Sequence, residues 1–82
     1  MIRRQRVRHQ PIAEGLRALP GQWGEVGNYE WLGSAQGAIR GIRQGLLPAY
    51  RPAGAFEAEI RRDAEGDAHV WARYVGAQEV AA

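Results

Sequence analysis

The stretch AFEAEIRRDAEGDAHVWARYV, residues 55–75, decides the fold because it holds two alternating segments around a turn. Such an alternation of apolar with polar or charged side chains is typical of strands that bury one face. Residues 63–67, between the two segments, are rich in the Asp and Gly of turns. The pattern predicts a β-hairpin whose apolar face carries Phe56, Ala58 and Ile60 from the first strand, with Val70, Ala72 and Tyr74 from the second.

The register of this hairpin follows from keeping its apolar side chains together. A loop over residues 63–67 aligns Ile60 with Val70 and sets Glu57 opposite Arg73, a favourable cross-strand pair. A slip of one residue would turn half of the apolar side chains to the other face of the sheet. We therefore expect a hairpin with one apolar face.

Upstream of the hairpin, residues 35–46 have the spacing of an amphipathic helix. Ser34 is expected to be its N-cap, and Gly45 its stop signal. Glycines four residues apart form a separate strip, and each interior one costs about 1 kcal/mol relative to Ala. The strip indicates close approach of another backbone or a ligand, unless it only reflects a Gly-rich composition. The apolar stripe consists of Ala35, Ala38, Ile39, Ile42 and Leu46, and the glycine strip of Gly37, Gly41 and Gly45.

The remaining elements are a short helix over residues 11–19 and one strand over residues 22–28. The order α-β-α-β-β predicts an α+β fold with a small three-stranded antiparallel sheet packed on one main helix. A reduced winged helix is the alternative, with residues 35–46 as recognition helix and residues 55–75 as wing. The predicted organisation is a disordered basic arm at 1–10, a single domain at 11–77 and a flexible tail at 78–82.

The composition of the 82 residues excludes several kinds of chemistry. There is no Cys and no Lys, so disulfides, Cys-based zinc sites and Schiff-base catalysis are absent. Two His without a spaced partner form no recognisable metal site. We expect a protein without catalytic residues, cofactor or metal. No apolar run approaches the ~18 residues of a membrane helix, so a cytoplasmic location away from membranes is expected.

Charge is concentrated at the amino end, although the net charge is only +2. Residues 1–43 carry seven Arg and three Glu, a net +4, whereas residues 44–82 carry four Arg and six acids, a net −2. A cluster of four arginines near the start is typical of a phosphate-seeking tail or of a solubilising end without a partner. These arginines are Arg3, Arg4, Arg6 and Arg8.

Three surfaces are candidate binding sites, each with a simpler structural explanation. The first is the polar helix face with Gln36, Arg40, Arg43 and Gln44, whose Arg and Gln types read base edges but also suit an ordinary solvated face. The second is the outer hairpin face with Arg61, His69, Trp71 and Arg73, where an exposed Trp can stack bases unless it is covered. The third is the loop at residues 50–54, where Tyr50 and Pro52 could equally close the core.

The chain resembles a group of short uncharacterised proteins from actinobacteria and their phages and mobile elements. The resemblance covers about residues 20–76 and implies a kind of genome rather than an activity. It rests on Pro20-Gly21-Gln22-Trp23, Ser34-Ala35, Ala38, Ile39-Arg40, Tyr50-Arg51-Pro52-Ala53-Gly54, Phe56-Glu57-Ala58 and Ala72-Arg73-Tyr74-Val75-Gly76.

Two functions follow from these features. The first is a small non-enzymatic nucleic-acid-binding protein that contacts double-stranded DNA, as a regulator or accessory factor of a phage or mobile element. The second is a protein–protein interaction module, an adaptor or inhibitor, that uses Trp71 and the glycine strip as a homodimer. The low net charge is smaller than most DNA-binding domains carry, so both functions stay open.

Overall fold

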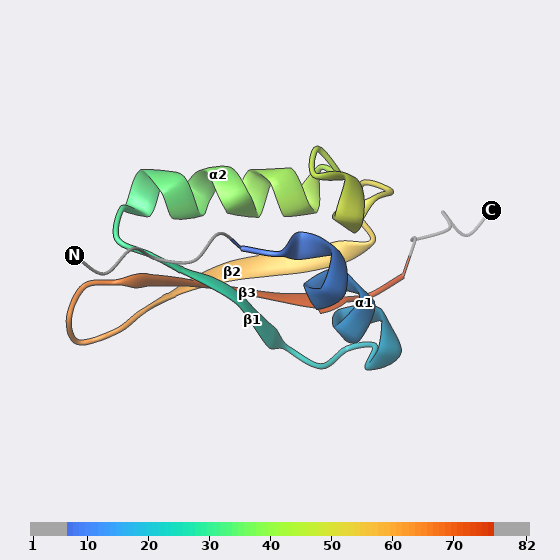
Figure 1. Ribbon diagram of the computed structural model, residues 1–82, viewed down its shortest axis with the longest axis horizontal. Helices are drawn as coiled ribbons and strands as arrows, with labels where there is room; N and C mark the ends of the chain where they lie inside the picture. The colour runs from blue at the N-terminus through green and yellow to red at the C-terminus, as the bar shows by residue number, and fades with distance from the viewer. Residues whose placement is uncertain (1–6, 77–82) are drawn as a thin grey trace.

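The computed structural model describes residues 7–76 as two α-helices, a short 3-10 helix and three strands (Figure 1). The three strands form one antiparallel sheet in the order β1-β3-β2, which confirms the predicted α+β fold. Predictions for residues 1–6 and 77–82, including Arg3, Arg4 and Arg6, lie outside the described residues. In chain order the elements are α1 (His9–Ala18), β1 (Gly24–Tyr29), α2 (Leu32–Arg43), η1 (Pro48–Tyr50), β2 (Phe56–Arg62) and β3 (Ala68–Tyr74).

The hairpin of β2 and β3 has the predicted register, with Ile60 opposite Val70 and Glu57 opposite Arg73. β1 pairs with the other side of β3, and its register shifts between Glu25 and Gly27. This β-bulge inserts one residue into β1 and explains why the alternation of residues 22–31 is poor in the sequence. The bulge keeps the side chain of Val26 in the core, where it is buried.

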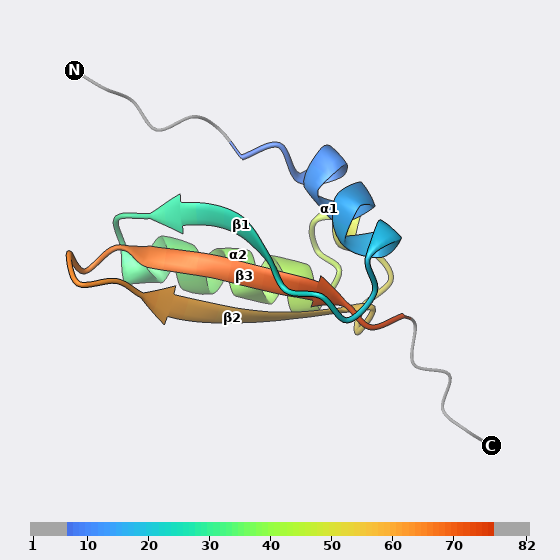
Figure 2. The same cartoon turned by 90° about the horizontal axis from the view of Figure 1, so that it is seen from below.

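α2 lies along one face of the sheet, and the other face carries no helix within residues 7–76 (Figures 1 and 2). The winged-helix alternative is wrong, because the hairpin lies flat under α2 instead of projecting from it. Side chains from α1, α2, η1 and all three strands share one apolar core. Its larger members are Leu16, Val26, Ile39, Ile42, Tyr50, Phe56 and Val70.

The boundaries of α2 differ from the predicted 35–46. The helix begins at Leu32 after an extended Trp31, so Ser34 lies in the first turn and is not the N-cap. At the other end, Gly45 has a φ of +65°, and the amide of Leu46 donates to the carbonyl of Gly41 at 2.9 Å. This left-handed residue ends the helix as expected, although the last helical residue is Arg43.

α1 begins at His9, two residues before the predicted start, and Val7 packs against the core. His9 contacts the ring of Tyr50 edge-on, and the Tyr50 hydroxyl lies 2.9 Å from His9 Nδ1. The predicted disordered arm is therefore wrong for residues 7–10. This contact joins positions 41 residues apart, which local sequence patterns do not reveal.

The loop between η1 and β2 was expected to close one end of the core. Tyr50 does so, since it is fully buried and its ring packs edge-on against Phe56 at 5.0 Å. Pro52 does not, because it lies exposed. Among the described residues, no helix has the length and apolar character needed to cross a membrane.

Candidate nucleic-acid interface

The predicted site residues lie on two opposite faces of the molecule. Gln36, Arg40 and Arg43 are exposed on α2 and Gln44 directly after it, whereas Arg61, Trp71 and Arg73 belong to the hairpin below. Arg8 is exposed immediately before α1. A single straight duplex therefore reaches one of the two faces, and their charges decide which.

Residues 31–55 contain no Asp or Glu, and they form α2, η1 and the adjoining loops, which we call the helix layer. The helix layer carries three arginines: Arg40, Arg43 and Arg51. By contrast, the strands and the β2–β3 turn carry six acidic residues and three arginines. Positive charge is thus separated from negative charge across the thickness of the molecule.

Two arginines of the helix layer are held by backbone carbonyls. Arg43 donates to the carbonyl of Ala58 at 2.7 Å, and Arg51 donates through Nε to the carbonyl of Gly45 at 3.2 Å. Arg17 of α1 extends the group, since it donates to the carbonyl of Arg51 at 2.8 Å. Carbonyl acceptors orient a guanidinium but leave its full charge available to an anion.

Two glycines in the amino-terminal half of α2 lie beside open space. A Cβ added at Gly33 or Gly37 would meet nothing within 4 Å, so these glycines face open space. The rest of the strip is different: a Cβ at Gly41 would lie 2.9 Å from Leu47, and one at Gly45 would lie 2.9 Å from the backbone nitrogen of Ala53. The predicted close approach of another backbone therefore applies to Gly45 only, because Gly41 meets a side chain.

Trp31 lies at the start of α2 with three quarters of its surface exposed (75%). The sequence left open whether this side chain belongs to the core. It belongs to the N-cap residue of α2, whose backbone is extended. It stands beside the open amino-terminal half of α2 as an unburied aromatic ring.

The outer sheet face, opposite α2, combines two tryptophans with paired charges. Arg61 stacks over Trp71 with its guanidinium 4.5 Å from the ring centre, and Arg73 stacks over Trp23 at 4.8 Å. The same guanidiniums form ion pairs with neighbouring carboxylates, so their charges are neutralised. We define the outer sheet face by Trp23, Glu57, Glu59, Arg61, Trp71 and Arg73. Sequence reasoning missed Trp23, because the bulge between Glu25 and Gly27 breaks the alternation that would relate its face to that of Tyr29.

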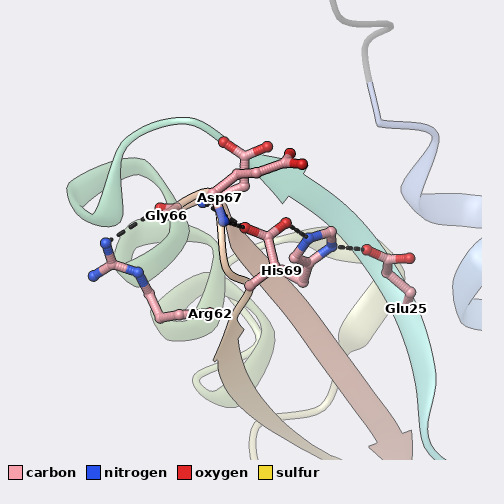
Figure 3. A network of polar contacts seen from close by, with 7 residues as sticks. Glu25, Arg62, Gly66, Asp67 and His69 are labelled. Atoms are coloured by element: carbon pink, nitrogen blue, oxygen red, sulfur yellow. Dashed lines mark hydrogen bonds and ion pairs between the residues drawn. The ribbon is translucent and has the colours of Figure 1, made fainter.

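His69 connects β1 to the β2–β3 turn beside this face (Figure 3). Its Nδ1 contacts the carboxylate of Glu25, and its Nε2 lies 2.7 Å from the carboxylate of Asp63. Because both ring nitrogens meet acceptors, the protonated imidazolium is favoured, and these hydrogen bonds raise the pKa of His69 above 6.5. The His69 hydrogen bond in turn lowers the pKa of Asp63.

Three carboxylates of the turn, from Asp63, Glu65 and Asp67, come within 4.8 Å of one another. The backbone amides of Glu65 and Asp67 donate to Asp63 at 2.9 and 3.0 Å, so the geometry of the turn accounts for this grouping. Exposed acidic groups of this kind are common, and the cluster supplies no argument for a metal ion.

No family model matches the chain, and neither the search of curated proteins nor that of solved structures found a match. The resemblance to actinobacterial and phage proteins therefore stays a prediction.

Proposed function

We propose that the protein binds double-stranded DNA through the helix layer. The observation that carries this proposal is the separation of charge: residues 31–55 form one layer with three arginines and no acidic residue. DNA presents a dense row of phosphates, which attract arginines on a surface that carries no carboxylates.

The dimensions of α2 suit the major groove. Its 12 residues span about 18 Å, and the groove is about 12 Å wide and admits one helix. Gln36 and Arg40 lie one turn apart on the exposed side, where Gln can read adenine and Arg can read guanine. Gly33 and Gly37 leave room for the amino-terminal half of α2 to enter the groove.

The two arginines of the helix layer that donate to backbone carbonyls have a different role in this proposal. Arg43 and Arg51 are already oriented by carbonyls, so binding a phosphate costs them little side-chain entropy. Phosphate contacts position a protein on a duplex, whereas base contacts provide specificity. The arm with Arg3, Arg4, Arg6 and Arg8 adds sequence-independent attraction to the same phosphates.

We do not place DNA on the outer sheet face, although Arg61, Trp71 and Arg73 were candidates. The ring of Trp71 is covered by the guanidinium of Arg61. Glu59 neutralises Arg61, and Glu57 neutralises Arg73. A stacked base would have to displace both contacts, and the carboxylates would repel the phosphates. In the biological setting that the resemblance implies, the protein is a regulator or accessory factor of a phage or mobile element.

Fluorescence anisotropy of a labelled mixed-sequence duplex tests the proposal. With roughly four phosphate contacts, affinity should fall about a hundredfold between about 50 and 200 mM salt. Arg40→Ala should weaken binding about tenfold, since one good base contact contributes roughly 1–3 kcal/mol. Arg73→Ala removes the same charge from the outer sheet face and is the matched control, expected to stay within about twofold of the unaltered protein. Equal losses in both variants, or no binding at low salt, would refute the proposal.

A further inference from the structure

The outer sheet face is not covered by a helix, and its Trp and Arg side chains are already held in place by contacts with each other and with carboxylates. Within residues 7–76 no helix lies over it (Figure 2). Trp23 and Trp71 are half-buried, each beneath a guanidinium that an ion pair also holds. Rigid Trp and Arg side chains dominate the binding energy of protein interfaces because little entropy is lost when they are covered.

The charges of this face identify the kind of partner that it fits. Arg61 and Arg73 balance Glu57 and Glu59, so these four side chains are neutral together and each cation has an acidic neighbour. A strongly basic or acidic partner would be repelled by half of them. A surface with the same alternation can match every charge, and a second copy of this chain provides one.

The register of the sheet shows how two copies match. Arg61 lies opposite His69, and Glu59 lies opposite Trp71, so these four residues form two adjacent rows across the strands. A two-fold axis parallel to the rows and midway between them brings Arg61 of each copy over Glu59 of the other. The same axis brings Trp71 of each copy opposite His69 of the other. Two-fold contacts of this self-complementary kind are the commonest among homo-oligomers.

We infer that the outer sheet face is the interface of a homodimer, which leaves the two helix layers on opposite outer sides. The face spans about 23 Å along the strands and about 14 Å across them, less than the ~800 Å² per partner of a standard interface. The dimer is therefore weak and dependent on concentration. This inference rests on the proposed function in one respect: with DNA bound to each helix layer, the dimer bridges two duplexes.

Sedimentation equilibrium from about 10 µM to about 1 mM tests the dimer without DNA. The average mass of the unaltered protein should rise from 9.1 kDa toward twice that value. Arg61→Glu and Glu59→Arg should each remain monomeric, because like charges then face each other. An equal mixture of the two variants should restore the dimer, since each contact between positions 59 and 61 across the interface again joins opposite charges. Arg62→Glu makes the same charge change on the neighbouring residue, whose side chain lies on the opposite side of the strand, and should dimerise normally.

The mixture keeps the inference falsifiable even where one variant is destabilised. A protein that stays monomeric throughout, or a mixture that fails to restore the mass, overturns the dimer. For bridging, a bead-bound duplex should capture a second, labelled duplex with the unaltered protein or the mixture, but with neither variant alone. Dimers that bind DNA in the anisotropy assay yet capture no second duplex overturn bridging. Absence of duplex binding refutes the proposed function, whereas the sedimentation result judges the dimer by itself.

Discussion

Arg43 reaches from the end of α2 to the free edge of β2, where it donates to the carbonyl of Ala58. The carbonyl of Ala55 accepts hydrogen bonds from the amides of Val75 and Gly76. Every second residue from Ala55 onward therefore directs its backbone N–H and C=O groups to β3, and the residues between them direct these groups away from the sheet. Unpaired backbone N–H and C=O groups at the edge of a sheet can pair with a strand of another molecule. Arg43 covers the middle of that edge, in addition to the charge it gives the helix layer.

Removing this side chain should therefore affect more than DNA binding. Arg43→Ala should lower the free energy of unfolding by about 1 kcal/mol, because the Ala58 carbonyl loses a charged donor. It should also increase light scattering on heating, as strand edges pair between molecules. Arg40→Ala removes the same group from an exposed position three residues earlier and should leave both properties unchanged. Urea unfolding and scattering of the two variants would decide, and identical behaviour would count against edge protection.

The two histidines should make stability depend on pH in opposite directions. Hydrogen bonds to Glu25 and Asp63 raise the pKa of His69 above the 6.5 of the unfolded chain. Its contribution is complete below pH 6.5 and is lost as the pH rises through the raised pKa. Burial lowers the pKa of His9, so stability falls as the pH drops below 6.5.

The two opposite pH dependences of the free energy of unfolding can be measured by denaturant unfolding from about pH 5 to about pH 9. His69→Gln should abolish the loss of stability on the alkaline side while keeping the loss on the acidic side. His9→Gln should do the reverse, because it removes the half-buried imidazole beside the Tyr50 hydroxyl. A His69→Gln protein that still loses stability above pH 6.5 would show that the network with Glu25 and Asp63 does not form in solution.

At the scale of the elements, a glycine inside α2 and the glycine that follows its end have different surroundings. Gly37→Ala should stabilise the protein by about 1 kcal/mol, because its Cβ meets nothing and the helix gains a better former. Gly45→Ala should destabilise it, because φ is +65° and the Cβ would lie 2.9 Å from the Ala53 backbone. Thermal unfolding should show melting shifts of opposite sign, about 4–8 °C for each 1 kcal/mol. Shifts of the same sign would contradict the difference between the two sites.

Elements with strict periodicity were predictable from the sequence. Alternation over residues 55–75 defined the hairpin and its register, and the stripe around Ile39 and Ile42 defined the buried side of α2. Prediction failed where a contact with a distant residue, or an irregularity in a strand, changes the structure that the local hydrophobic pattern indicates. The start of α1 depends on the contact of His9 with Tyr50, and the bulge of β1 hides the face on which Trp23 lies.

The candidate site was predictable only in part for the same reason. Residue types on the exposed side of α2 follow from helical spacing, so Gln36 and Arg40 could be named. Which arginines are neutralised depends on the register and on the side chains that reach them. The pairing of Arg61 with Glu59, and the carbonyl bound by Arg43, appear only in the folded chain.

At the scale of the whole molecule, the place of a charge should matter more than the net charge. Gln44→Glu puts a carboxylate into the helix layer, whereas Gln22→Glu puts one at an exposed position between α1 and β1. Both changes lower the net charge by one. Gln44→Glu should weaken duplex binding about fivefold, with little effect from Gln22→Glu. Anisotropy titrations at one salt concentration compare them, and equal losses would mean that only the net charge matters.

The central position of β3 also has a consequence for the order of folding. Each strand pair of the sheet includes β3, although it is the last strand in the chain. During synthesis from the amino end, β1 and β2 therefore leave the ribosome without a pairing partner. The sheet, and with it the surface on which α2 packs, assembles only after residue 74 has emerged. The hairpin then closes locally within about 1–10 µs, while the return of β1 over some forty residues is the slower step.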